Sequence, residues 1–507
     1  MSIELLPTLP AGPAATAFRL ALTYDDVLLV PRRSSVRSRS EVSTSSRLTR
    51  RLTLAAPVVA ANMETVTEAP MAIAMARAGG LGVIHRFLPV AHQAAMVERV
   101  KRAENLIIRD PYRIGEDATV GEARGLMREK GVRSLLVVGR DDGRLAGILT
   151  ARDLRLDPAD DEPIARYATR RDQLVTAPPD VTLEEARLTL HRHRIEKLPL
   201  IDADGVPVGL VTVQDLVALR ERPHASKDVR GRLLVGAAIG VRGDYLERAA
   251  ALIDAGVDVL VLDIAHGHAE HALAALERLR GDHPDIDLVA GNVATAAGAD
   301  DLCRAGADAV KVGVGPGSAC TTRIVAGVGV PQLTAVMDAV AACRPHDVPV
   351  IADGGIREPG DMAKAIAAGA ECVMVGNLLA GTDESPGTVV TRGGRKVKVY
   401  RGMASAAATQ RRMAAEGIEP PAGTLFASVR SAGADVDLAG HAVPEGVEAT
   451  VPYRESATAI VANLVGGLRS SMSYADARTV AEFHENAEFV RITQAGLLES
   501  RPHDLDL

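Results

Sequence analysis

The chain has 507 residues, of which 47% are hydrophobic and 24% charged, as expected for a globular protein of two to four domains. Its net charge is −7 and no basic stretch is interleaved with aromatic residues, so nucleic acid and anionic membranes are poor candidates as partners. The four cysteines lack CxxC spacing, which argues against a zinc or disulfide framework. No apolar run reaches about 18 residues and no signal-like segment begins the chain, so we expect a cytoplasmic protein.

Eight short apolar runs recur along the chain, most of them followed by a helix-like stretch. Runs without polar alternation fit strands that are buried on both faces, and strand–helix repetition implies parallel pairing with right-handed crossovers. We therefore predict an α/β fold, a (β/α)8 TIM barrel with its chemistry at the carboxyl ends of the strands. A doubly wound open sheet is the alternative. The runs are Ala56–Met63, Gly80–His85, Leu233–Gly240, Val257–Ala265, Ile286–Val293, Ala307–Gly315, Val348–Gly355 and Glu371–Asn377.

The regular spacing breaks once, between the second and third runs, where an internal repeat fills the gap. The segment Ala146–Leu154 returns as Val208–Leu216, 62 residues later (209 − 147). Each copy follows an apolar strand and a turn rich in Asp and Gly. We predict an inserted domain at residues 106–222, with the barrel formed by residues 1–105 and 223–507.

This repeat resembles the tandem CBS (Bateman) module. The resemblance implies that a Thr and an Asp of each copy hold the ribose and phosphate of a regulatory nucleotide such as ATP or GTP. These residues are Thr150 with Asp153 and Thr212 with Asp215. The alternative is that they only cap helices, a role for which Thr and Asp are well suited.

The stretch Gly315–Arg323 is the most informative part of the sequence. It follows an apolar run and is rich in glycine, so we expect a buried strand that passes into a loop where backbone approaches a ligand closely. Cys320 in this loop is exposed to substrate, and a cysteine thiolate is a good nucleophile. By residue type alone a small buried cysteine is the alternative.

Polar residues and glycines end other runs, and we expect them on the same rim. Asp353 suits a ribose diol, and the two glycines after it leave N–H groups for a phosphate. Together with Gly376–Asn377 and Ser318 they suggest a cradle for a 5′-phosphate. Further polar residues suggest a second ligand beside the cysteine, with zinc at the two histidines as the alternative; they are Asp263, His266–His268 and Gly291–Val293.

With these features the sequence resembles the IMP dehydrogenase/GMP reductase family over nearly its whole length. The resemblance implies an oxidoreductase that binds a purine nucleotide so that a cysteine adds to C2 of the base. Besides the cysteine loop, the matching segments are LTYDDVLLVP (Leu22–Pro31), GVGVPQLTAV (Gly327–Val336), IADGGI (Ile351–Ile356), YRGM (Tyr400–Met403), VPEGVE (Val443–Glu448) and GGLRSSMSY (Gly466–Tyr474).

The resemblance also implies roles for individual residues. Cys320 is the nucleophile, Thr322 activates a leaving or attacking group, and Glu445 accepts from N1–H of the base. The implied nucleotide site comprises Met63, Ser318, Asp353, Gly355, Gly376, Asn377, Tyr400, Met403 and Glu445. Implied contacts to a nicotinamide cofactor are Asp263, Ala265, Asn292 and Gly313. A monovalent cation, K+, is implied at Gly315, Gly317 and Cys320, with Glu499 and Ser500 completing the site across a subunit interface; the usual following His is Arg501 here.

The two branches of the family differ in a flap, here residues 404–442. A dehydrogenase carries an Arg-Tyr pair on the flap, whose Arg acts as base toward water, whereas a reductase must avoid water. This flap contains no tyrosine, and its only aromatic residue is Phe426. Solvated arginine is ordinary on the alanine-rich helix and loop that carry its arginines, which are Arg411, Arg412 and Arg430.

Other features point in both directions. Asn62 before the Met of Ala60–Met63 resembles the reductase branch. Reductases, however, carry a Glu shortly after the YRGM-like segment, and Ala406 stands there instead; Glu416 or Glu419 are the candidates to substitute. The segments VPEGVE and AEFVRITQAGLLES look more like dehydrogenases.

Because general-base assistance is typically worth about 10²–10⁴-fold, we weigh the missing Arg-Tyr pair most heavily. We expect a GMP reductase-like enzyme that uses NADPH to convert GMP, or a related 2-aminopurine nucleotide, to IMP through a covalent Cys320 adduct. The alternatives are an IMP dehydrogenase that uses NAD to form XMP, and a catalytically silent nucleotide-binding homologue. The resemblance further implies a homotetramer, or an octamer formed through the CBS repeats.

Overall fold

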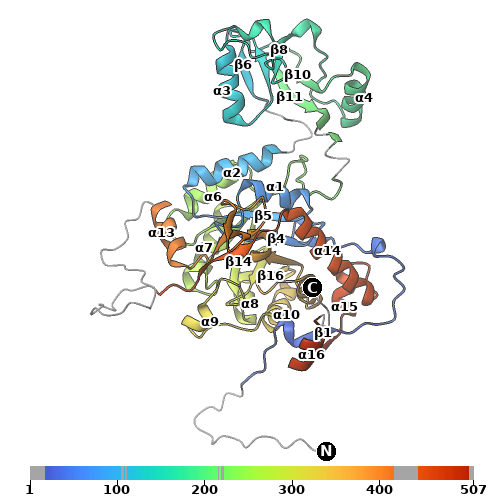
Figure 1. The fold of residues 1–507 in the computed structure, drawn as a ribbon, viewed down its shortest axis with the longest axis vertical. Coiled ribbons are helices and arrows are strands. Elements are labelled where there is room, and N and C mark those ends of the chain that lie inside the picture. Colours follow the sequence, from blue (N-terminus) through green and yellow to red (C-terminus); the bar gives the residue numbers. More distant parts are fainter. Residues whose placement is uncertain are drawn as a thin grey trace, which may run out of the picture.

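The structure is a computed structural model that describes residues 18–103, 108, 111–214, 216–217, 222–415 and 443–501 (Figure 1). Eight parallel strands form a closed barrel, so the expected fold class is confirmed and the open-sheet alternative is wrong. In barrel order they are β12 (Gly236–Ile239), β13 (Val259–Asp263), β14 (Asp287–Val293), β15 (Ala309–Val312), β16 (Val350–Asp353), β17 (Cys372–Val375), β4 (Val58–Ala60) and β5 (Leu81–Ile84), and β5 pairs with β12 to close the ring. Each lies within one of the eight apolar runs.

The strands are apolar throughout because both of their faces are buried. In β16 the side chain of Ile351 joins the cluster inside the barrel, whereas Val350 and Ala352 join the cluster between barrel and helices. β4 alternates in the same way, with Val59 inside and its two neighbours outside. Neither face meets water, so the period-2 polar pattern of a half-exposed sheet does not arise.

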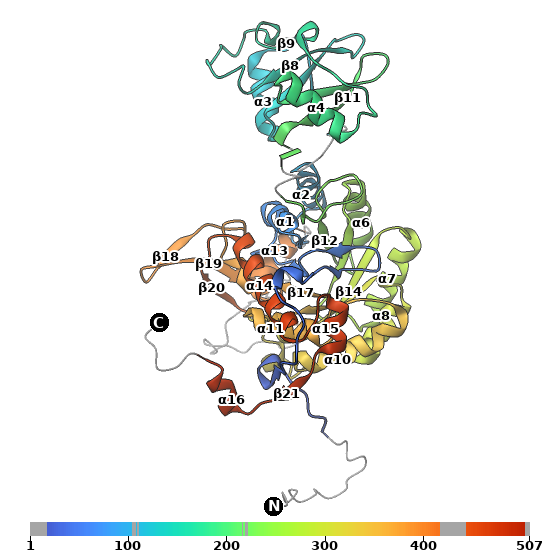
Figure 2. The same cartoon turned by 90° about the vertical axis from the view of Figure 1, so that its right-hand side faces the viewer.

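Helices cover the outside of the barrel (Figures 1 and 2). They are α1 (Ala69–Arg77), α2 (Val90–Ala103), α6 (Tyr245–Asp254), α7 (Glu270–Asp282), α8 (Ala296–Arg304), α10 (Gln332–Cys343), α11 (Pro359–Ala367) and α14 (Ala457–Tyr474). The last of these packs against both α11 and α1, and so takes the eighth helical position.

Between β17 and α14 the chain makes a long excursion. It comprises α12 (Asn377–Ala380), a three-stranded antiparallel sheet of β18 (Val390–Arg392), β19 (Arg395–Arg401) and β20 (Glu448–Pro452), and α13 (Ala406–Ala415) between β19 and β20. The remaining elements outside the insert are η1 (Tyr24–Asp26), β1 (Val27–Leu29), η2 (Arg39–Glu41), β2 (Ser46–Arg47), β3 (Thr53–Leu54), α9 (Thr322–Val325), η5 (Arg344–His346), α15 (Val480–Asn486), β21 (Phe489–Arg491) and α16 (Gln494–Glu499).

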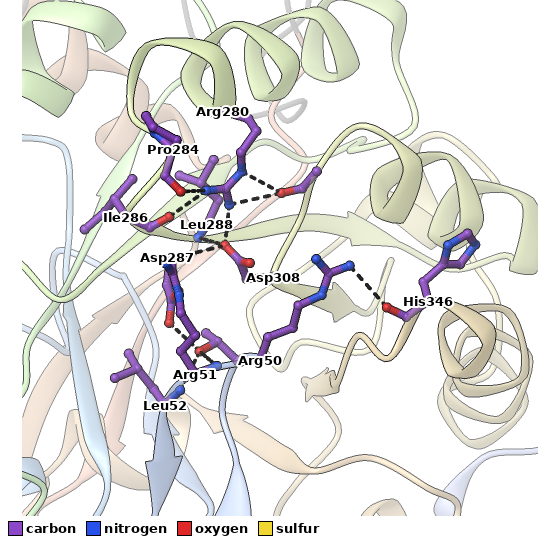
Figure 3. A network of polar contacts seen from close by, with 12 residues as sticks. Arg50, Arg51, Leu52, Arg280, Pro284, Ile286, Asp287, Leu288, Asp308 and His346 are labelled. Carbon is purple, nitrogen blue, oxygen red and sulfur yellow. Dashed lines mark hydrogen bonds and ion pairs between the residues drawn. The ribbon is translucent and has the colours of Figure 1, made fainter.

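The hairpin β2–β3 lies at the amino-terminal ends of the strands, opposite the rim of strand ends expected to hold the site. Two buried aspartates there, Asp287 at the start of β14 and Asp308 just before β15, bind the Arg51 and Arg280 side chains (Figure 3). Thr49 donates a further hydrogen bond to Asp287 at 2.5 Å. Polar interactions at this end of a barrel serve stability rather than chemistry.

The described residues between 108 and 217 form a separate unit (Figures 1 and 2). Its first half contains β6 (Arg113–Gly115), α3 (Val120–Lys130), β7 (Ser134–Val138), β8 (Leu145–Thr150), η3 (Ile164–Arg166), β9 (Thr169–Arg170) and η4 (Arg171–Gln173), and its second half α4 (Leu183–His193), β10 (Lys197–Ile201) and β11 (Pro207–Thr212). Thr119 and Thr182 begin the two helices with the same capping box to a Glu three residues on, so the internal repeat is structural. Both halves have apolar clusters of their own. Within the described ranges, no helix combines the length and apolarity that crossing a bilayer requires.

Candidate active site

The carboxyl ends of the strands meet at one rim, and the loops that follow them carry most of the predicted site residues. The cysteine loop follows β15, the Asp353 segment ends β16, and Gly376 follows β17. Met63 follows β4, which is the neighbour of β17 in the barrel, because β17 pairs with β4. Residues that are far apart in sequence therefore share one end of the barrel.

The cysteine loop is lined by the Val443–Glu448 segment. Cys320 pairs with Gly446 in an antiparallel bridge, and the Thr321 N–H donates to the Glu445 carbonyl at 2.8 Å. The Cys320 thiol lies 3.2 Å from Thr322 Oγ1, and that hydroxyl donates to Glu445 Oε2 at 2.7 Å. Thiol, hydroxyl and carboxylate thus form a continuous chain along which a proton can move.

This geometry adds to the role expected for Glu445. The resemblance implied that its carboxylate faces N1–H of a purine, whereas the structure shows it accepting the Thr322 hydroxyl. A carboxylate has two oxygens and about four lone-pair sites, so the contact leaves capacity for the base. The structure also supplies what Ala406 cannot, since Ala406 begins α13 and carries no polar side chain.

A second group of predicted residues gathers around Gly376. The Ser318 hydroxyl lies 3.4 Å from the Tyr400 hydroxyl, which lies 3.6 Å from Met63 Sδ. A Cβ at Gly376 would lie 3.1 Å from both the Met63 sulfur and the Tyr400 hydroxyl, so a side chain at this position would crowd both. Burial raises the pKa of Tyr400, which keeps the hydroxyl protonated as a donor. Gly355, whose φ is +81°, follows Asp353 in the loop after β16, the strand next to β17.

Asp353 and Asn292 belong to one polar cluster, so the predicted nucleotide and cofactor contacts adjoin each other. The Asn292 amide donates to Asp353 Oδ2 at 2.9 Å and to the Gly313 carbonyl at 2.8 Å. Lys311, whose side chain is 2% exposed, donates to Asp353 Oδ2 at 2.9 Å and to Asn292 Oδ1. Sequence analysis did not single out this lysine, although a lysine inside the apolar run Ala307–Gly315 was a visible signal.

Gly313 is needed at its position for a steric reason. Its φ is +152°, and a Cβ there would overlap the carbonyl oxygen of Asp353. The same residue presents its carbonyl to Asn292, so it links the ends of β14, β15 and β16. Its predicted contact to a cofactor stays a prediction.

The other predicted cofactor residues follow β13. Asp263 ends that strand and forms an ion pair with Arg86, Nε to Oδ2 at 3.5 Å, a partner that sequence analysis missed. Ala265 is exposed in the loop that follows. His268 is bound to Asp301 at 2.7 Å. Across the described ranges, no group of three or more His, Cys, Asp or Glu side chains is arranged to hold a metal ion, which leaves the zinc alternative without support.

The residues implied in cation binding lie in two places in the chain. The Gly317 carbonyl accepts the Cys320 N–H at 3.0 Å, and Gly315 has a φ of +89°. Glu499 ends α16, which packs against η1, and the Ser500 hydroxyl donates to the Gly496 carbonyl at 2.8 Å. A joint K+ site across a subunit interface stays a prediction.

Two further sets of predicted residues are only partly described. In the flap, α13 is described and Arg411 on it pairs with Glu64 at 3.4 Å. Outside the described residues or side chains lie Arg412, Glu416, Glu419, Phe426, Arg430 and, in the insert, Asp215. Both the N–H and the hydroxyl of Thr150 donate to Asp153 Oδ2 at 2.7 Å, within a turn at residues 151–156 rather than at the start of a helix.

Fold and rim together define a barrel enzyme whose polar site lies at the carboxyl ends of its strands. The family model described as IMP dehydrogenase / GMP reductase domain matches residues 21–503. The chain therefore belongs to this family, whose members are oxidoreductases of purine nucleotides that use nicotinamide cofactors.

Named relatives fall in both branches of the family. The inosine-5′-monophosphate dehydrogenase of Nitrosopumilus maritimus is 50% identical over 488 residues, 96% of this chain and 99% of that protein. The enzyme of the same name from Aquifex aeolicus is 49% identical over 488 residues, 96% of each. A crystal structure of a cysteine-to-alanine variant of GMP reductase from Trypanosoma brucei, in complex with guanosine 5′-monophosphate, matches with a TM-score of 0.89 at 43% identity, covering 97% of this chain and 99% of that one.

Proposed function

We propose that the protein is a GMP reductase, which converts GMP to IMP and ammonia with NADPH as reductant. The observation that carries this proposal is the flap at residues 404–442, which contains no tyrosine and hence no Arg-Tyr pair to activate water. Arg411, the flap arginine whose side chain is described, is already paired with Glu64. Without a base for water, a covalent purine adduct is open to reduction rather than hydrolysis.

The residues of the cysteine loop supply the steps before reduction. The Cys320 sulfur adds to C2 of GMP, and the C2–N bond to the exocyclic amine then breaks. Thr322 donates its proton to the departing amine and regains one from Glu445, which lies 2.7 Å away and must itself be protonated at that stage. The products of this half are ammonia and the covalent nucleotide–cysteine adduct.

The cofactor side of the site rests on Asp263, Ala265, Asn292 and Gly313. The Asp263 carboxylate at the end of β13 suits the hydroxyls of a ribose, so this part of the site fits the group, whereas the Asn292 amide already donates to Asp353 and Gly313. A bound nicotinamide cofactor would supply the hydride that C2 receives. Release of the Cys320 sulfur then yields IMP.

The nucleotide phosphate is held in this proposal by Ser318, Gly355, Gly376 and Tyr400. The support is that Gly376 lies close to the Tyr400 hydroxyl, which in turn lies beside the Ser318 hydroxyl, since hydroxyl and free backbone N–H donors suit phosphate oxygens. Asp353 takes the ribose diol, and Met403 and Glu445 face the base. The buried Lys311 and the half-buried Asn292 donate to the Asp353 carboxylate and keep it oriented.

The second candidate is IMP dehydrogenase, and the names of the relatives at 47–50% identity favour it. A paired assay decides between the two. Purified enzyme is incubated with GMP and NADPH, or with NADH, and separately with IMP and NAD, and the nucleotides are separated by chromatography. IMP from GMP is the expected result, with no turnover in Cys320→Ala although that variant still binds GMP. Sustained XMP formation from IMP would overturn the proposal.

We further propose that the inserted unit binds ATP or GTP at Thr150, Asp153, Thr212 and Asp215, and that the chain forms tetramers that pair into octamers. The support is the repeated helix–strand–strand arrangement of the two halves. Light scattering with and without each nucleotide measures the assembly. Thr150→Val with Thr212→Val is expected to remove any effect of the nucleotide, and an unchanged response would exclude these residues.

A further inference from the structure

A buried arginine lies directly beside the proposed nucleotide site. Arg401 ends β19, immediately after Tyr400, and its side chain is 9% exposed. Its Nη1 donates to Glu64 Oε1 at 2.6 Å, and its Nε donates to Glu448 Oε2 at 2.5 Å. Its backbone N–H donates to Thr65 Oγ1 at 3.1 Å. One residue therefore joins three separate segments of the chain.

Each of these segments carries a residue of the proposed site. Glu64 and Thr65 follow Met63, whose sulfur contacts the Tyr400 hydroxyl. Glu448 begins β20 and lies three residues after Glu445, which holds the Thr322 hydroxyl. The arginine side chain thus connects the loop after β4, the end of β19 and the strand that lines the cysteine loop.

The charges of the two carboxylates explain why an arginine is needed at position 401. The Glu64 side chain is 4% exposed, so its carboxylate depends on guanidinium partners rather than on water. Burial alone would lower the pKa of Arg401, but its hydrogen bonds to Glu64 and Glu448 outweigh burial and raise it. Glu448, with a side chain 48% exposed, has solvent as an alternative partner. The guanidinium fork is the group that can bind two carboxylates in fixed directions at once.

We propose that Arg401 is a positioning residue that holds the Glu445 carboxylate against the Thr322 hydroxyl. It acts through Glu448 and the backbone between the two glutamates, with Glu64 as the fixed point. The inference rests on the proposed use of the Thr322–Glu445 contact in proton transfer. Because a misplacement of about 1 Å can cost about 10²-fold in rate, Arg401 governs the chemical step more than nucleotide affinity.

The first test is Arg401→Lys, which keeps a positive charge but lacks the fork. We expect kcat, expressed per Cys320 titrated with iodoacetamide, to fall about 10–100-fold. The Kd for the nucleotide, measured by calorimetry, should stay within threefold. Arg395→Lys is the matched control, because Arg395 is exposed at the other end of the same strand, and both quantities should stay within twofold. A kcat within threefold of wild type in Arg401→Lys overturns the inference.

A second measurement separates positioning from a general structural role. In an enzyme that already carries Glu445→Gln, adding Arg401→Lys should lower kcat by no more than twofold, because the residue acts through that carboxylate. A further loss equal to that of the single variant shows an independent route and overturns the inference. If Arg401→Lys does not fold, Glu448→Gln cuts only the exposed arm and should show the same loss confined to kcat; unchanged kcat there overturns the inference.

These ratios are measured in whichever direction the wild-type enzyme turns over. XMP formation by the wild type would overturn the proposed reductase function. The Arg401 inference would then be tested by the same kcat ratios, measured in the direction of XMP formation. A wild-type chain without turnover in either direction would overturn both.

Discussion

Lys311 offers the sharpest test of how the site is organised. Its ammonium group is buried at the end of β15, where it binds Asp353 Oδ2 at 2.9 Å and the side-chain oxygen of Asn292. Lys311→Met keeps most of the length of the side chain and removes the charge. The change leaves the Asp353 carboxylate with one described side-chain donor, the Asn292 amide at 2.9 Å.

The size of the effect follows from this loss. Removing one partner of a buried ion pair costs about 3–5 kcal/mol, because the other charge is left without compensation. Asp353 is 22% exposed and keeps its Asn292 donor, so part of its charge is still solvated. We therefore expect the lower limit, about 3 kcal/mol. At about 2.1 cal/mol/K of unfolding entropy per residue, this corresponds to a fall in Tm of about 3–4 °C for a barrel of roughly 390 residues.

Differential scanning calorimetry measures this, since it separates the transition of the barrel from that of the inserted unit. Lys396→Met is the control: Lys396 is exposed on β19, stacks 5.6 Å from the Tyr453 ring, and should shift Tm by less than about 1 °C. The double variant Lys311→Met with Asp353→Asn should be about 1–3 kcal/mol more stable than the sum of the single losses predicts. A shift below about 2 °C in Lys311→Met, or additive losses, would refute the argument.

Two further variants test the proposed site. Glu445→Gln should lower kcat by about 10²–10⁴-fold with nucleotide Kd within threefold, because the Thr322 hydroxyl loses its proton partner; a change confined to KM in steady-state assays would instead place Glu445 at the base edge alone. Gly376→Ala places a methyl group 3.1 Å from the Tyr400 hydroxyl and should raise the KM for the nucleotide about tenfold while Tm stays unchanged; an unaffected KM would remove Gly376 from the phosphate site.

The sequence was sufficient to predict the barrel because its signal is local and repeated. Each strand is apolar on both faces, as Val350, Ile351 and Ala352 of β16 show, and each ends in residues that a helix or strand interior disfavours. Parallel strands then place all such ends at one rim, so Cys320 and Asp353 could be assigned to the same site without a structure.

The partners within that site could not be predicted in this way. Glu445 reaches Thr322 across 123 residues of sequence, after the chain has left the barrel and returned along the cysteine loop. Arg401 lies inside a matching motif and Glu64 directly follows Ala60–Met63, and nothing in their spacing shows that they meet. Lys311 did carry a signal, because an isolated lysine in a buried strand requires a buried partner.

The position of Glu445 bears on whether the protein is a reductase or a dehydrogenase. Ala406 was one of the features that spoke against a reductase, beside the dehydrogenase-like segments VPEGVE and AEFVRITQAGLLES, since it leaves no carboxylate on that side of the loop to serve Thr322. The structure brings a carboxylate to Thr322 from the opposite segment, so the absence at Ala406 removes no step. If the same carboxylate acted as base toward water, hydrolysis of the adduct would depend on a second base beside it. The flap offers no Arg-Tyr pair for that task, and Arg411 is engaged with Glu64. These observations support the proposal that the adduct is reduced rather than hydrolysed.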